Sequence, residues 1–467
     1  MIWPFKRAAG APAEAAHVDA QKLASSAQDC QVRGDVEGAV EGYEASLALD
    51  PGRAQVHNNL GNLYLGLGRL EDAEASFRLA IRADAGLAEG PLNLAMLLTQ
   101  TGRAGEAIAH CRKALALRPQ FPEANLSLGF LLEQEGDSEE AMQRYGDAVA
   151  ARPDYAEARF SLALQQLLRG DYANGWREYE WRMRLPGHEG AWLPGGRAAW
   201  DGAPLEGRTI LLYAEQGFGD VIQFVRYVPL VAERGGRVIL SCQPKLKALL
   251  GTVPGVSAVL GTGEPLPPFD VSCPLMSLPR VFGTTTQTIP SQVPYVRPDA
   301  ERVQKWRARL AGDAASLKVG LYWATETRNR ISPLRTLSLD VLAPLASIQG
   351  ITYYSLQRGE AASQAAHPPQ GMRLIDLAAE LGDFADDAAL MSNLDLIISI
   401  NTATAHLAGA LGRRVWTLTQ FPPDWRWLLG RDDSPWYPTM RLFRRGRHED
   451  WAQVILRLGD AIRQLVA

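Results

Sequence analysis

The chain has 467 residues, of which 46% are hydrophobic and 21% are charged, and its formal net charge at pH 7 is −4. This length exceeds what one ordinary hydrophobic core accommodates, so we expect two or three domains. The composition excludes a wholly disordered chain, and the charge gives no indication of nucleic-acid binding. The four cysteines are far apart and form no Cys-x-x-Cys pair, which predicts neither a disulfide framework nor a zinc site.

The first 20 residues start with a short apolar run, continue with Lys6-Arg7 and then become rich in alanine. They lack the apolar centre of a signal peptide, and no stretch approaches the roughly 20 apolar residues that span a bilayer. We therefore expect a flexible tail at 1–20, no transmembrane segment and a cytoplasmic location.

A constant spacing of 34 residues runs through the next part of the chain. It relates three sets of residues: Gly34, Gly68, Gly102, Gly136 and Gly170; Leu60, Leu94, Leu128 and Leu162; and Ala39, Ala73, Ala107 and Ala141. This period, with a glycine between two short helical patterns, is typical of tetratricopeptide repeats, in which each repeat is a helix–turn–helix. The glycine favours φ > 0 where the first helix ends, and the alanine lets the second helix pack closely. We predict an all-α tetratricopeptide superhelix at 21–184.

Stacked repeats form a concave surface, which predicts a groove for an extended peptide. By resemblance to other tetratricopeptide proteins, asparagines on the first helices would bond a peptide backbone there, namely Asn58, Asn59, Asn62 and Asn93. The alternative is a rigid spacer or a dimerisation element. Aromatic residues at Tyr172, Trp176, Tyr179 and Trp181 indicate a capping helix attached to the adjoining domain, and the Pro- and Gly-rich stretch 185–207 indicates an irregular connector.

From Arg208 onwards, short apolar runs alternate with helical patterns. We expect strands at 209–214, 237–242, 269–273, 318–323, 351–356, 395–400 and 415–418. Strands that alternate with helices imply parallel sheets, and two such sets imply two Rossmann-like halves with a cleft between them. The predicted halves are 208–310 and 311–467.

Two motifs in this region resemble the heptosyltransferase-like glycosyltransferases, namely Gly217-Phe218-Gly219-Asp220 after the first strand and the run 399–412 followed by Val415-Trp416. The stretch 421–438 resembles the ending of bacterial proteins that fuse tetratricopeptide repeats to such a domain. The chain as a whole resembles bacterial fusions of tetratricopeptide repeats with such a domain, including flagellin-modifying ones. The resemblance implies an α/β GT-B fold whose first half faces the acceptor and whose second half binds a nucleotide sugar. It implies an inverting, metal-independent transfer without a further cofactor.

The presumed donor site begins where a helix follows the strand 395–400. Backbone N–H groups at Thr402-Ala403-Thr404 could bind a diphosphate, although Asn401 or Thr402 could equally cap this helix. His406 matches a histidine of the family, with a buried structural histidine as the alternative. Arg335 matches an arginine that would neutralise the diphosphate, with an exposed surface arginine as the alternative.

Asp220 is the candidate general base, because Gly217 and Gly219 permit a tight turn that brings its carboxylate into the cleft. Its alternative role is to cap the helix that begins at the next residue. Gly217, Phe218 and Gly219 form the acceptor-side loop. We expect an ion pair between Asp424 and Arg426 that fixes the C-terminal loop.

Two departures from the family pattern bear on function. Asn401 stands where the family carries aspartate, and the stretch 324–336 keeps only Arg335-Thr336, with Arg328 and Arg330 as replacement cations. The sequence leaves three hypotheses. The first is transfer of a sugar to Ser or Thr hydroxyls of a protein bound by the repeats, with flagellin as one acceptor. The second is transfer to a lipid-linked or polysaccharide acceptor. The third is a non-catalytic scaffold that retains the fold.

Overall fold

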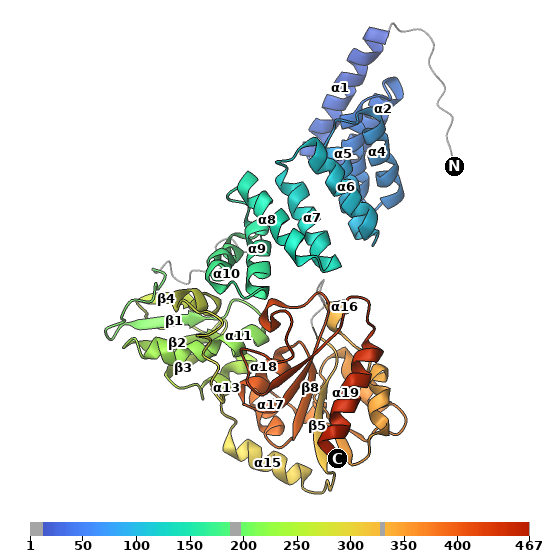
Figure 1. Cartoon of the computed structure of the whole chain (residues 1–467). Helices are drawn as coiled ribbons and strands as arrows, with labels where there is room; N and C mark the ends of the chain where they lie inside the picture. The colour runs from blue at the N-terminus through green and yellow to red at the C-terminus, as the bar shows by residue number, and fades with distance from the viewer. Residues whose placement is uncertain (1–12, 187–197, 327–331, 467) are drawn as a thin grey trace. The chain divides into compact units, whose positions relative to one another are not determined.

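The computed structural model describes residues 13–186, 198–326 and 332–466, and the chain divides into two compact units, Met1–Arg159 and Phe160–Ala467 (Figure 1). The boundary falls inside helix α9 (Ala156–Leu168), so the end of the repeat region belongs to the second unit. Among the described residues, no helix is long and apolar enough to cross a membrane.

The first unit is a series of antiparallel helix pairs. Its helices are α1 (Ala13–Val32), α2 (Val36–Leu49), α3 (Ala54–Gly66), α4 (Leu70–Ala83), α5 (Glu89–Gln100), α6 (Ala104–Leu117), α7 (Pro122–Glu135) and α8 (Ser138–Ala151). Helix α1 begins at Ala13, inside the segment 1–20 that was expected to be a tail. The alanine-rich composition of this segment favours helix more than it favours a flexible chain.

The periodic glycines end the first helix of each repeat, and the periodic alanines are buried in the second helix, as their spacing predicts. Gly34, Gly68, Gly102, Gly136 and Gly170 have φ values of 80°, 75°, 76°, 84° and 83°. At each of them the following amide closes the helix, as where Arg69 N donates to Tyr64 O at 2.8 Å. Ala39, Ala73, Ala107 and Ala141 are all fully buried. The helix–turn–helix prediction is confirmed.

The second unit starts with the end of α9, helix α10 (Tyr172–Tyr179) and a short 3-10 turn, η1 (Glu180–Arg184). Its first sheet is parallel, with the order β3-β2-β1-β4. The strands are β1 (Thr209–Tyr213), β2 (Arg237–Cys242), β3 (Val256–Gly261) and β4 (Val271–Pro274). The helices of this half are α11 (Phe218–Phe224), α12 (Val228–Ala232), α13 (Lys247–Leu250) and α14 (Leu278–Val281).

The second sheet is also parallel and has the order β10-β9-β8-β5-β6-β7. Its strands are β5 (Leu317–Tyr322), β6 (Ile351–Ser355), β7 (Leu374–Asp376), β8 (Leu396–Ile400), β9 (Val415–Thr419) and β10 (Met440–Arg444). The helices are α15 (Ala300–Leu310), α16 (Ser332–Arg335), α17 (Phe384–Met391), α18 (Ala403–Ala410) and α19 (Trp451–Val466). Parallel sheets with helices follow the predicted α/β class, and all seven predicted strands are present.

Aromatic residues attach α10 to the rest of the second unit. The Trp176 ring meets Trp425 edge-on at 5.3 Å, and Tyr172 stacks on Trp436 at 6.1 Å. The expected capping helix is therefore confirmed. Of the connector 185–207, residues 187–197 lie outside the described part, and Trp200 N donates to Ser272 O at 2.8 Å beside β4.

Candidate functional site

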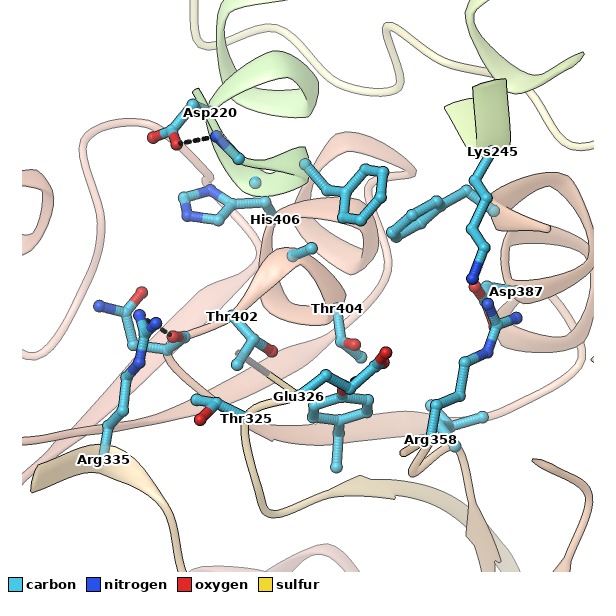
Figure 2. A pocket seen from close by; sticks show the side chains of 18 of the residues that line it. Asp220, Lys245, Thr325, Glu326, Arg335, Arg358, Asp387, Thr402, Thr404 and His406 are labelled. Carbon is cyan, nitrogen blue, oxygen red and sulfur yellow. Dashed lines mark hydrogen bonds and ion pairs between the residues drawn. The ribbon is translucent and has the colours of Figure 1, made fainter. Parts of the chain in front are cut away.

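A cavity of about 560 Å³ opens among the loops that follow the carboxyl ends of strands in both sheets. The loop after β1 contributes Gln216 to Asp220, those after β5 and β6 contribute Thr325, Glu326 and Arg358, and the turn after β8 contributes Asn401 to Thr404. Ligands of open α/β sheets bind at such carboxyl ends. Figure 2 shows Asp220 and His406 at one end of this cavity and Arg358 with Asp387 at the other.

The β1–α11 turn brings Asp220 to the cavity. Asp220 Oδ2 accepts a hydrogen bond from Gly217 N at 3.1 Å, so this side chain caps α11 from the third helical residue. The alternative interpretation is corrected in position, because α11 begins at Phe218 and not at Val221. A Cβ added at Gly219 would lie 2.9 Å from His406 Cδ2 and 3.6 Å from Ala403 N. Glycine at 219 therefore lets the first turns of α11 and α18 approach closely, while the Phe218 ring packs on Phe384 at 4.9 Å.

The other oxygen of Asp220 forms an ion pair with Arg426, which lies in the 3-10 turn η9 (Trp425–Trp427). Arg426 also pairs with Asp424 at 3.1 Å and donates from Nε to Gln223 Oε1 at 2.8 Å. Burial raises the pKa of Asp220, and the Arg426 guanidinium opposes that shift. The predicted Asp424–Arg426 ion pair is confirmed, and Arg426 also pairs with Asp220, the candidate base.

Asn401 is buried beside this network. Its Nδ2 donates to Asp424 Oδ2 at 3.4 Å, and its carbonyl accepts from Arg335 Nη1 at 3.2 Å. The Asp424 carboxylate therefore lies beside the amide of Asn401 and is paired with Arg426. Arg335 is partly buried, which excludes the exposed-surface alternative, and burial lowers its pKa.

The first turn of α18 faces the cavity. Thr402 is the N-cap residue, but among the described residues its side chain makes no capping bond to this helix. The Thr402 hydroxyl instead lies 3.3 Å from Ser399 Oγ and 3.4 Å from Ile400 O. Both Ala403 and Thr404 line the cavity. The backbone N–H groups at this helix start therefore remain candidates for an anion.

His406 is buried and makes structural contacts as well as lining the cavity. Its Nδ1 lies 2.8 Å from Tyr437 Oη, and its ring stacks on Trp427 with centroids 5.4 Å apart. Burial, with Arg426 nearby, lowers the pKa of His406 to about 3. The imidazole is therefore neutral near pH 7, which favours the structural interpretation over that of a cation for phosphate.

The far end of the cavity contains charged residues that sequence reasoning missed. Arg358 pairs with Asp387 at 2.9 Å, and burial raises the pKa of Asp387 to about 7. Lys245 extends from the first half toward Asp387 (Figure 2), and Tyr322 Oη donates to Glu326 Oε1 at 3.0 Å. The positions of Glu326 and Arg358 just after strands could have identified them, whereas no motif distinguishes Lys245 or Asp387.

Arg328 and Arg330, the proposed replacement cations, lie outside the described residues. Of the retained Arg335-Thr336 motif, Thr336 is held at the cavity wall, where its Oγ1 lies 3.0 Å from Thr325 Oγ1. Within the described ranges, no group of three or more His, Cys, Asp or Glu side chains has the arrangement of a metal site.

The asparagines of the repeat unit differ in their surroundings. Asn58 is buried, and its Oδ1 accepts from Asn93 Nδ2 at 2.9 Å, which links α3 to α5. Asn59 is half-buried and donates to Tyr43 Oη at 3.4 Å, whereas Asn62 is exposed. The prediction that all four line a groove is corrected at Asn58, because the first helices of neighbouring repeats meet at this position.

Comparisons with known proteins support the repeats. Two family models described as tetratricopeptide repeat match residues 27–88 and 98–173. Protein FlbA of Caulobacter vibrioides is 27% identical over 328 residues, and the match covers 64% of this chain and 54% of FlbA. The chain thus spans about half the length of that curated relative.

Several similar solved structures each cover a little more than a third of this chain. MamA protein is 20% identical with a TM-score of 0.32, over 37% of this chain and 95% of its own. YrrB, described as a TPR protein with an unusual peptide-binding site, is 21% identical with a TM-score of 0.31, over 36% and 88%. PilF of Pseudomonas aeruginosa is 18% identical with a TM-score of 0.35, over 38% and 78%.

Proposed function

We propose that the second unit is a GT-B glycosyltransferase that moves a sugar from a nucleotide-sugar donor to an acceptor hydroxyl. The observation that carries the proposal is the start of α18, where N–H groups without a capping side chain face a cavity that also holds Arg335 and Asp220. A leaving diphosphate needs hydrogen-bond donors such as these N–H groups, and an attacking hydroxyl needs a carboxylate on the opposite side of the sugar to accept its proton.

In the proposed reaction, the acceptor hydroxyl oxygen forms a bond to the anomeric carbon of the sugar while the bond from that carbon to the phosphate oxygen breaks. The nucleoside diphosphate leaves with the electron pair, and the hydroxyl proton passes to Asp220. Each oxygen of Asp220 accepts one hydrogen bond, from Gly217 N or from Arg426, and retains a lone pair for the acceptor. Burial strengthens Asp220 as a base because it raises the pKa.

The repeats supply the acceptor side of the proposal. Tetratricopeptide arrays present an extended concave surface for a protein partner, and we propose that they select a protein whose Ser or Thr hydroxyls are modified. Flagellin is one such acceptor by resemblance, and a lipid-linked or polysaccharide acceptor is the alternative.

A non-catalytic binding protein is the second candidate. It is favoured by the engagement of both oxygens of Asp220, one in helix capping and one with Arg426, and by the amide at position 401. In that case the cavity would bind a nucleotide sugar or another diphosphate without turnover.

The test is thermal unfolding of the full chain with a panel of nucleotides and nucleotide sugars, followed by incubation with acceptor protein and mass analysis. Ala403 is the first residue of α18, where proline is tolerated but removes the N–H. Ala403→Pro should abolish the ligand-induced rise in Tm, and the matched Ala300→Pro at the first residue of α15 should not. A hundredfold excess of ligand over Kd stabilises by about 2.7 kcal/mol, which is measurable.

The outcomes separate the two candidates. A shift with one nucleotide family together with a mass increase on the acceptor, lost in Asp220→Asn, supports the transferase. A shift without turnover supports the binding protein. No shift with any nucleotide refutes both.

A further inference from the structure

Residues 172–184, which form α10 and η1 and are called here the α10–η1 segment, contact both loops that build the Asp220–Arg426 pair. The first contact is an ion pair from Arg182 Nη2 to Glu215 Oε1 at 2.8 Å. The two side chains are 4% and 1% exposed. Glu215 immediately precedes Gln216 and Gly217, which line the cavity.

Further hydrogen bonds hold this ion pair in one arrangement. Glu215 Oε1 also accepts from Met276 N at 3.2 Å, and Arg182 Nη2 donates to Ser277 Oγ at 2.9 Å. Arg182 Nη1 pairs with Glu180 at 2.8 Å within the segment itself. A buried ion pair with this many hydrogen-bond partners has few alternative geometries. It therefore fixes the position of the loop that carries Glu215.

The second contact supports the opposite side of the pair. Trp176 of the α10–η1 segment meets the Trp425 ring edge-on at 5.3 Å, and the guanidinium of Arg426 lies over that same ring at 4.3 Å. Residues of the α10–η1 segment thus contact both the loop that precedes Asp220 and the residue next to Arg426, although Asp220 and Arg426 are 206 positions apart in the sequence.

We propose that Arg182 is a positioning residue for the cavity: through its ion pair with Glu215 it holds the β1–α11 loop so that Asp220 meets Arg426. The last helical segment of the repeat region is then a structural part of the site. The assignment of Asp220 as catalytic base rests on the proposed function, whereas the position of the loop does not.

The test compares full-length variants by hydrogen exchange of peptides covering 214–220 and by kinetics. Arg182→Met removes the ion pair, Arg182→Lys keeps a cation, and Glu215→Gln keeps an acceptor oxygen without the charge. Arg177→Met is the matched control, because Arg177 lies on α10 with its side chain 66% exposed. Exchange of β2 peptides in each variant shows whether the sheet remains folded.

We expect exchange at 214–220 to be about tenfold faster in Arg182→Met, with β2 unchanged, and to be partly restored in Arg182→Lys. The kcat should fall between about 10- and 100-fold while donor Kd changes less than about twofold, because the donor is proposed to bind the second half. If Arg182→Met does not fold, Arg182→Lys and Glu215→Gln carry the test, each with a smaller increase in exchange at 214–220.

Equal exchange at 214–220 in Arg182→Met and Arg177→Met would overturn the proposal. So would a uniform increase across 214–220 and β2, or a parallel loss of kcat and donor affinity. If the wild-type chain turns over no donor, the proposed function fails, and the exchange data alone still decide the positioning role.

Discussion

The repeat unit and the α/β unit differ in the sequence distance over which their decisive contacts form. In the repeats, Gly61 packs against Phe77 and Gly129 against Tyr145, so the same contact recurs within single repeats. In the α/β unit, Asp220 and Arg426 are 206 positions apart. A contact that recurs in each repeat can be recognised in a single sequence because its residue pattern occurs several times. A contact between two distant loops occurs only once, so no repeated pattern indicates it.

The largest expected effect is at the contact between distant loops. Arg426→Met would leave Asp220 and Asp424 buried without their shared cation, and such a change costs about 3–5 kcal/mol. Every tryptophan except Trp3 lies in the second unit, so urea unfolding followed by tryptophan fluorescence reports this loss.

Arg431→Met is the control for that variant. Arg431 pairs with Asp433, whose side chain is 68% exposed, and such surface pairs contribute less than about 1 kcal/mol. If both variants unfold at the same urea concentration, the Asp220–Arg426–Asp424 network does not stabilise the unit.

The second prediction concerns the contact that recurs in the repeats. A Cβ at Gly61 would lie 2.6 Å from Phe77, and a Cβ at Gly129 would lie 2.6 Å from Tyr145. Each Gly→Ala change should therefore cost about 1–3 kcal/mol through overpacking, and the two costs should be similar. Far-UV circular dichroism during urea unfolding reports the helices of this unit.

Gly66→Ala provides the comparison, because Gly66 lies on the same helix as Gly61 with nothing within 4 Å of the added Cβ. It should stabilise by about 0.5–1 kcal/mol, since alanine favours helix. Destabilisation by Gly66→Ala would show that overpacking is not what makes alanine costly on this helix, and unequal costs at Gly61 and Gly129 would show that the two repeats are not equivalent in packing.

The same contrast explains how much of the fold the sequence predicted. The helix pairs followed from their period, and the central strands followed from continuous apolar runs, because both of their faces are buried. Three strands were missed, β3, β7 and β10, and each lies at an edge of its sheet. In β3 only one of six positions is fully buried, so its sequence lacks a continuous apolar run, whereas β4, also at an edge, is buried at all four positions and was predicted.

The candidate site was predicted in part, for a related reason. Residues inside motifs, such as Asp220 and Arg335, lie at the cavity as expected. The ion pair between Asp424 and Arg426 was predicted because the two residues are close in sequence. The link from Arg426 to Asp220 was not predicted, because it depends on how one half folds against the other. The pair between Arg358 and Asp387 was not predicted either, because it joins two separate segments of the second half, the loop after β6 and α17.

The third prediction tests the buried histidine at the meeting point of α11 and α18. The pKa of His406 is lowered from 6.5 to about 3 in the folded chain, so only the unfolded chain binds this proton between those values. The stability that neutral His406 contributes is present above pH 6.5 and is lost as pH falls toward 3, by about 1.4 kcal/mol per pH unit.

His406→Gln should flatten the dependence of unfolding free energy on pH between about 6.5 and 4, measured by tryptophan fluorescence. His448→Gln, at an exposed position, should leave the wild-type slope unchanged. A wild-type slope in His406→Gln would mean that other groups cause the acid sensitivity.

The smallest expected effect concerns a helix cap, because the repeats share their packing geometry but not their N-cap hydrogen bonds. Asp137 Oδ1 accepts a hydrogen bond from Glu140 N at 3.1 Å and caps α8, whereas the N-cap of α4, Arg69, makes no such bond among the described residues. Asp137→Ala should cost about 1 kcal/mol, and Asp137→Asn should cost almost nothing, because asparagine caps equally well. Urea unfolding followed by circular dichroism measures both. Equal losses in the two variants would assign the effect to the charge of Asp137 near the helix start, and not to its hydrogen bond.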